Sequence, residues 1–132
     1  FPNMKFLPLF LLGLAAPALL TSCASSDMRE TEYSQGKPKE RYQVRVENGK
    51  EIKEGPYESW YENGKKEFEG AYRNDLWDEH WAHWYESGGK HWEGDFFDGN
   101  KRGYWTIWKE NGEVEIQGRW SPLHKGLVLP KK

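Results

Sequence analysis

The chain has 132 residues and a formal net charge of −2; 30% of its residues are charged and 36% are hydrophobic. This length suits a single domain. Nucleic-acid-binding surfaces neutralise phosphates with clustered lysine and arginine, and the sequence has no such cluster, so we expect no nucleic-acid partner. Tryptophan, tyrosine and phenylalanine make up 16% of the chain. Because each aromatic ring buries roughly 150–250 Å², these rings are expected to supply much of the core.

Residues 1–22 have the composition of a secretory signal peptide. One charged residue, Lys5, precedes the apolar run "FLPLFLLGLAAPALL" at residues 6–20. This run is too short for a membrane-spanning helix, which needs about 20 apolar residues. Residues 1–3 precede Met4 and are interpreted as sequence upstream of the start. The sequence therefore predicts an exported protein.

The signal ends in "LTSC" at residues 20–23, which resembles the bacterial lipobox. The alternative is a plain signal peptide followed by an incidental cysteine. The resemblance implies that Cys23 is lipidated, becomes the first residue of the mature protein and holds it at a membrane. Ala24, by analogy with lipoprotein sorting in enteric bacteria, indicates the outer membrane on its periplasmic side. Since Cys23 is the only cysteine, no disulfide within the chain supports the fold.

Residues 23–40 are predicted to form this lipidated cysteine and a flexible tether. The segment "ASSDMRETEYSQGKPKE" at residues 24–40 is rich in serine, glutamate and lysine and has no apolar periodicity. A polar segment of this kind does not bury enough surface to offset the entropy lost on ordering.

From residue 41 onward an internal repeat dominates the sequence. The phrases "WYENGK", "WYESGG" and "WKENGE" begin at Trp60, Trp84 and Trp108, with a constant offset of 24. A repeat of this period indicates a stacked array in which each unit buries its neighbour's face. The columns that match under the offset are Tyr57, Trp81 and Trp105; Trp60, Trp84 and Trp108; Phe68, Trp92 and Ile116; Gly64, Gly88 and Gly112; Gly70, Gly94 and Gly118; and Tyr72, Phe96 and Trp120.

Each repeat is predicted to be a β-hairpin. Asn63 and Gly64 lie between runs rich in aromatic residues, and an Asn-Gly pair supplies the positive φ angles of tight hairpin turns. A further Asn-Gly pair, Asn48 and Gly49, adds a partial unit before the first full repeat. We therefore predict an all-β fold, an elongated antiparallel meander of repeated hairpins over residues 41–121. The expected hairpins span about 41–54, 55–78, 79–102 and 103–121, and a C-terminal tail, 122–132, is expected to cap the last strand.

Two details of this meander are less constrained by the sequence. The phrase "YENGK" is compatible with a two-residue turn or with a three-residue turn that ends in a glycine bulge. The three-residue turn is preferred because it is expected to place Trp60 and Phe68 on one face. The connection "RNDLWDE" at residues 73–79 lacks both glycines of its counterpart "FDGNKRG" at residues 97–103, so it is expected to be irregular.

The segment "HWEGDFFDGNKRGYWTIWKENGEVEIQGRW" at residues 91–120 resembles the MORN repeat. "WYENGK" is similar to a bacterial variant of that repeat, often labelled as the antitoxin of a toxin–antitoxin pair. Departures from the pattern are Glu79, where glycine is usual, and Gly89, where lysine is usual. The resemblance implies an elongated antiparallel sheet that acts as a scaffold or binding surface for phospholipids or proteins. The positions that carry it are Trp92, Gly94, Phe96, Gly99, Lys101, Gly103, Trp105, Gly112, Gly118 and Trp120.

No catalytic site is predicted. The carboxylates recur with the repeat as strand and turn decoration, and a flat sheet has no cleft across which two carboxylates face each other about 5–10 Å apart. We expect no cofactor and no enzyme activity.

Histidines gather in the middle unit at His80, His83 and His91. His83 and His91 are expected to be cross-strand neighbours, close enough in principle to share a metal ion. His80 and His83 are three residues apart on a strand and therefore point to opposite faces. Two histidines without a third ligand do not make a predicted metal site, and the alternative is that they are partly exposed polar positions.

Tyr57, Trp81 and Trp105 form the candidate binding surface. This column lies three residues before Trp60, Trp84 and Trp108, so the two columns are expected on opposite faces. A sheet with rings on both faces has either two covered faces or one exposed aromatic stripe, and such stripes bind glycans, lipids or proteins. The alternative is that sheet twist, or the tether and the tail, covers these rings.

These features together predict a lipid-anchored envelope scaffold that docks a protein partner on a MORN-like β-repeat surface. The alternatives are recognition of a glycan or lipid through an exposed aromatic face, and an antitoxin or immunity protein.

Overall fold

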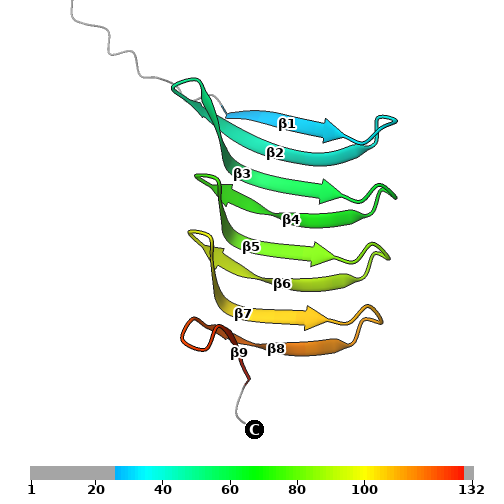
Figure 1. Cartoon of the computed structure of the whole chain (residues 1–132), viewed down its shortest axis with the longest axis vertical. Coiled ribbons are helices and arrows are strands. Elements are labelled where there is room, and N and C mark those ends of the chain that lie inside the picture. Colours follow the sequence, from blue (N-terminus) through cyan, green and yellow to red (C-terminus); the bar gives the residue numbers. More distant parts are fainter. Residues whose placement is uncertain (1–25, 130–132) are drawn as a thin grey trace, which may run out of the picture.

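A computed structural model describes residues 26–129 of the chain, which form one nine-stranded antiparallel sheet (Figure 1). Each strand pairs with its neighbours in the chain, so the sheet is an open meander, as predicted. The strands are β1 (Ser26–Glu32), β2 (Pro38–Glu47), β3 (Lys50–Trp60), β4 (Lys66–Arg73), β5 (Leu76–Trp84), β6 (Lys90–Phe97), β7 (Asn100–Trp108), β8 (Val114–Ser121) and β9 (Gly126–Val128).

Long turns join the strands along one side of the array, at the strand ends on the right in Figure 1. In the first full repeat the Tyr61 N–H donates to the Lys65 carbonyl and the Gly64 N–H donates to the Tyr61 carbonyl, both at 2.8 Å. Gly64 has a φ of 85°, a conformation that glycine adopts without a Cβ penalty. The equivalent hydrogen bonds recur at residues 85–89 and 109–113. The three-residue turn with a glycine bulge is therefore confirmed.

The bulge that follows this turn changes which side chains share a face. Ser59 pairs with Phe68, Trp60 pairs with Lys66, and the register shifts between them. The prediction that Trp60 and Phe68 share a face was therefore wrong, because Glu67 is an extra residue on β4 that reverses the expected alternation. The same shift pairs Trp84 with Lys90 and Trp108 with Val114.

Short two-residue turns join the strands along the opposite side of the array. They lie at Asn48 and Gly49, at Asn74 and Asp75, and at Asp98 and Gly99, and all six residues have positive φ. The connection at residues 73–79 was expected to be irregular, and this was wrong. Asparagine and aspartate tolerate the left-handed conformation well enough to replace the missing glycine, and Glu79 adopts a φ of 61° where Gly103 has 68°.

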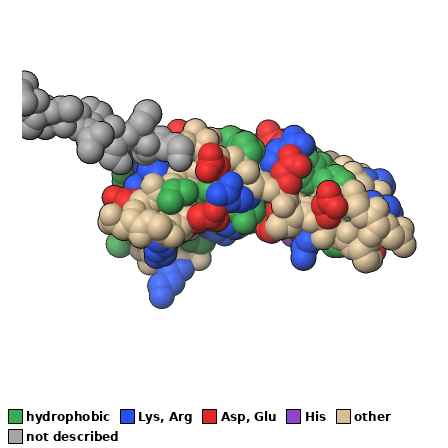
Figure 2. Space-filling model, turned by 90° about the horizontal axis from the view of Figure 1, so that it is seen from above, with side chains coloured by type: hydrophobic (Ala, Val, Ile, Leu, Met, Phe, Trp, Pro, Cys, Tyr) green, Lys and Arg blue, Asp and Glu red, His purple; other side chains and the backbone are tan. Residues whose placement is uncertain are grey.

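The prediction of a flexible tether at residues 23–40 was wrong for the described part of that segment, which belongs to the sheet. Residues 26–40 form β1 and the start of β2, and the Tyr33 N–H donates to the Lys37 carbonyl at 2.8 Å, as at Tyr61. "YSQGK" at residues 33–37 is thus a further copy of "YENGK". Ion pairs of Arg29 with Glu51 and of Arg41 with Glu30 hold this polar hairpin. Figure 2 shows the interspersed charges at this end of the array, which suit an edge that resists pairing with other chains.

The C-terminal tail adds a short last strand to the sheet. It forms β9, which pairs with β8 from Arg119 to Ser121, so it caps part of the last long strand as predicted. The expected signal peptide and the expected lipidation site, Cys23, lie outside the described residues.

The core consists of rings that pack along one face of the sheet. Its buried members are Tyr57, Trp81, Phe96 and Trp105, and Trp77 stacks on Trp81 with 4.1 Å between ring centroids. The indole of Trp81 lies over Gly70, where a Cβ would meet the ring at 2.2 Å. Gly94 lies under Trp105 with the same spacing. At Gly70 and Gly94, therefore, the indole of the neighbouring strand occupies the place that a side chain would take.

Candidate binding site on the open face

The two faces of the sheet differ in how their aromatic columns are packed. We call the face with Tyr57, Trp81 and Trp105 the core face and the face with Trp60, Trp84 and Trp108 the open face. The predicted separation of the two columns is confirmed, since the open-face tryptophans take no part in the core cluster.

The predicted binding column is the buried one, which corrects the sequence interpretation. Tyr57, Trp81 and Trp105 are 8%, 0% and 2% exposed. Rings from adjacent strands cover them, and Lys53 and Lys101 extend over the outer rings. The predicted tail contributes Leu127 to this packing, and Glu40 of the predicted tether accepts a hydrogen bond from the Tyr57 hydroxyl at 2.7 Å. This column is therefore not an exposed stripe. Partly buried rings remain on both faces, Trp77, Trp92 and Trp120 on the core face and Trp60, Trp84 and Trp108 on the open face.

On the open face, cationic side chains alternate with the partly buried tryptophans. The Lys90 ammonium lies 5.7 Å from the ring centroids of both Trp84 and Trp108, and Lys66 lies 5.7 Å from Trp84. Arg41 takes the equivalent place 5.8 Å from Trp60. Each cation within about 6 Å of a ring centroid is attracted to the negative face of the ring.

Carboxylates fix these lysines in place. Lys66 donates to Glu69 at 2.6 Å and to Glu58 at 3.0 Å, and Lys90 donates to Glu93 at 2.7 Å. Burial lowers the pKa of Lys66, but the hydrogen bonds to Glu69 and Glu58 outweigh this effect and raise its pKa above the ordinary value. Lys66 therefore stays charged at neutral pH, and the open face presents paired charges around aromatic rings.

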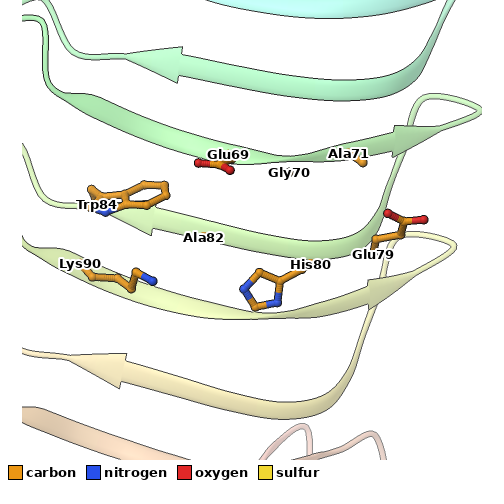
Figure 3. A pocket seen from close by; sticks show the side chains of 8 residues that line it. All are labelled: Glu69, Gly70, Ala71, Glu79, His80, Ala82, Trp84 and Lys90. Carbon is orange, nitrogen blue, oxygen red and sulfur yellow. The ribbon is translucent and has the colours of Figure 1, made fainter.

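A hollow of about 340 Å³ lies in the middle of the open face, over β4, β5 and β6 (Figure 3). We call it the Trp84 hollow. Its floor is Gly70, Ala71 and Ala82, and its walls are Glu69, Glu79, His80, Trp84 and Lys90.

Two alanines create the Trp84 hollow. At the position of Ala82 the neighbouring units have Glu58 and Thr106. At the position of Ala71 the following units have Asp95 and Arg119. Larger side chains stand at these positions in the other units. Small floor residues therefore meet beside a tryptophan where β4 of the first full unit pairs with β5 of the middle unit. This departure from the repeat was visible in the sequence, but it was not recognised as a site.

Several polar groups line the hollow. His80 Nδ1 lies 2.8 Å from Asp95 Oδ1, and its Nε2 lies 3.7 Å from Glu93. Glu79 is exposed and lies 4.0 Å from Arg73. These groups offer hydrogen bonds and charge around a flat apolar floor beside an indole, which are the elements of a recognition site.

The histidines follow the prediction in part. His83 Nδ1 and His91 Nδ1 lie 2.9 Å apart on the core face near the long turns, so their proximity is confirmed. His80 lines the open-face hollow, on the opposite side of the sheet from His83, as expected. Within residues 26–129, no group of three or more histidine, cysteine, aspartate or glutamate side chains is placed to hold a metal ion.

Comparison with known proteins returns no match, whether with family models, curated proteins or solved structures. The resemblance to MORN repeats stays a prediction. Among the described residues there is no helix of the length and apolarity needed to cross a membrane.

Proposed function

We propose that this protein is a lipid-anchored scaffold of the cell envelope, built of MORN-like repeats, which docks a protein partner on its open face. The observation that supports this best is the line of Trp60, Trp84 and Trp108 with cations and carboxylates between them. Tryptophan is enriched among residues that dominate interface energies, and paired charges around such anchors suit a polar rim. The proposed role involves binding alone and no catalysis.

Within this proposal the Trp84 hollow seats an anchoring side chain of the partner. The hollow has a closed floor at Ala82, which is 6% exposed, and a ring wall at Trp84. Anchors of protein interfaces fill desolvated pockets of this kind near the centre of the contact. The hollow lies over β4, β5 and β6, near the middle of the array, so a partner that lies along the array has contacts on both sides of it.

Site-specific photo-crosslinking in a bacterial host tests the docking face. A photoreactive residue at His80, on the rim of the hollow, is expected to give a discrete adduct, while one at Lys101 on the core face gives none. The Trp84→Ala substitution is expected to remove the His80 adduct. Equal adducts from both positions, or none from His80, would contradict the proposal. The membrane anchor is tested separately by the intact mass of the membrane-purified protein, because Cys23→Ser should abolish a diacyl or triacyl increment.

A second candidate function is glycan recognition, favoured by the combination of an indole with His80, Glu69 and Glu79 around one hollow. Sugar rings stack on indoles and hydrogen-bond to such groups. Binding of soluble cell-wall fragments would then quench tryptophan fluorescence, and Trp84→Ala would remove the quenching. No response from the wild-type chain would rule out this second function, and protein docking would be the remaining proposal.

A further inference from the structure

The middle unit carries a histidine pair on the core face where the other units have different residues. His83 replaces Ser59 and Ile107, and His91 replaces Glu67 and Glu115. In the first unit the Ser59 hydroxyl donates to Glu67 at 3.2 Å, so these two columns meet across the strands. In the middle unit the meeting atoms are the Nδ1 nitrogens of both histidines, 2.9 Å apart.

The hydrogen bonds around His83 define its tautomer. The Tyr61 hydroxyl donates its one proton to the Trp84 carbonyl at 2.6 Å. His83 Nε2 lies 3.3 Å from the Tyr61 hydroxyl oxygen. Because the hydroxyl has no second proton to donate, Nε2 must carry the proton of that contact. The Nδ1 of His83 is then an unprotonated acceptor that faces the His91 Nδ1–H. Burial, and secondly the charge of His91, lower the pKa of His83 to about 4, so its Nδ1 is free of protons at neutral pH.

We propose that His83 and His91 bind a divalent transition-metal ion through their Nδ1 atoms, with copper(II) or nickel(II) preferred. Two nitrogens at adjacent corners of a square-planar ion, each about 2.0 Å from the metal, are about 2.8 Å apart. At a tetrahedral ion the same bonds separate the nitrogens by about 3.3 Å. The observed 2.9 Å is the hydrogen-bond distance of the metal-free pair, and it places both Nδ1 atoms within reach of one ion.

The surroundings hold both rings in place. The contact of His83 Nε2–H with Tyr61 is the kind of outer hydrogen bond that orients a metal-binding histidine. Phe68 packs on His83 with 4.4 Å between ring centroids, and Tyr85 stacks on His91 at 4.3 Å. The Tyr85 hydroxyl is itself fixed, since it donates to the Trp108 carbonyl at 2.9 Å.

Metal binding at this pair changes the ring orientations and one tautomer. The rings turn so that both Nδ1 lone pairs meet the ion, and the proton of His91 Nδ1 moves to its Nε2 through solvent. Both imidazoles stay neutral and no proton is released. Because no third ligand of the common types joins the pair within residues 26–129, water or an external ligand completes the coordination.

The first unit supplies a matched control, because His83→Ser combined with His91→Glu recreates its Ser59 and Glu67 pair. His80→Gln is a second control, since His80 lies on the other face and contacts Asp95. All chains carry Cys23→Ser so that the thiol does not compete for metal. Unfolding midpoints without metal show that each variant folds.

Copper(II) titration of the full chain at neutral pH, followed by calorimetry and electron paramagnetic resonance, tests the site. One ion is expected per chain, with splitting from two imidazole nitrogens, and the ion should raise the unfolding midpoint. The double substitution H83S/H91E should lower the affinity at least tenfold, while His80→Gln should leave it unchanged. A wild-type spectrum without imidazole nitrogens, or equal affinity in the double variant, would overturn the proposal. The spectrum decides the matter even if the variant fails to fold.

Discussion

The core face and the open face use the same residue type in different ways. On the core face, the indoles of Trp81 and Trp105 lie flat over Gly70 and Gly94 and are buried. On the open face, Trp84 lies between Lys66 and Lys90 and is only partly buried. A glycine on the neighbouring strand gives each of these core-face indoles room to lie against the sheet, and burial of the ring follows from that room.

Removal of one indole from each face should give the largest difference in stability between the two faces. Trp81→Ala is expected to lower the free energy of unfolding by about 3–5 kcal/mol, as for other fully buried aromatic side chains. Trp84→Ala should lower it by roughly 1 kcal/mol, because less of its surface is removed from water. Urea denaturation of both variants measures the two values. Equal losses would mean that the open face is as structural as the core face.

The glycines beneath the indoles give the next largest effect. A Cβ at Gly94 would lie 2.2 Å from the Trp105 ring, so Gly94→Ala should displace the ring and cost about 1–3 kcal/mol. Gly89 is the matched control, since the nearest atom to its Cβ position is 3.7 Å away. Gly89→Ala should change the free energy of unfolding by less than about 0.5 kcal/mol. A tolerated Gly94→Ala would contradict the packing of indole on glycine.

The burial of His83 on the core face predicts a pH dependence of stability. Its folded-state pKa of about 4 lies below the ordinary value of 6.5, so the unfolded chain binds more protons between these values. The stability that His83 contributes is complete above about pH 6.5 and is lost as the pH falls toward 4, by about 1–2 kcal/mol after solvent screening.

Denaturation at several pH values, compared with the single variant His83→Ser, isolates this effect because the carboxylates are the same in both chains. The wild-type chain should lose more stability across the window than His83→Ser. Parallel pH profiles of the two chains would show that His83 is not perturbed by its place on the core face.

Glu79 offers the smallest effect and the only expected gain. It adopts a φ of 61° at a position where the other units have glycine. Glu79→Gly should therefore raise the free energy of unfolding by up to about 1 kcal/mol. Glu115→Gly, at an exposed strand position, should instead lower it by about 0.5–1 kcal/mol. Thermal or urea unfolding distinguishes the two signs, and a loss at Glu79 would mean that its carboxylate contributes more than its backbone strain costs.

The sequence predicted the parts of the fold that depend on local turn chemistry. The glycines at 64, 88 and 112 indicated the long turns, and the period of 24 indicated a meander of hairpins. The face of Phe68 was predicted wrongly, because a bulge reverses the alternation that a regular strand would have. The strand at residues 26–32 was missed because its polar composition resembles a tether, although "YSQGK" repeats the turn phrase.

The candidate site was harder to predict for a different reason. The sequence left open whether Tyr57, Trp81 and Trp105 are covered or form an exposed stripe, because the rings that cover them come from adjacent strands. The Trp84 hollow depends on small side chains at Ala71 and Ala82, which are on different strands. Their proximity follows from the strand register, and that register was not settled by the sequence.

The most direct test of the division between a structural face and a binding face is one paired measurement on Trp84→Ala. The unfolding midpoint and the yield of the His80 photo-crosslink are determined on the same preparation, with the wild-type chain beside it. We predict a midpoint close to the wild-type value together with loss of the adduct. A midpoint that falls as far as that of Trp81→Ala, or an adduct of unchanged yield, would contradict the assignment of the open face as the binding surface.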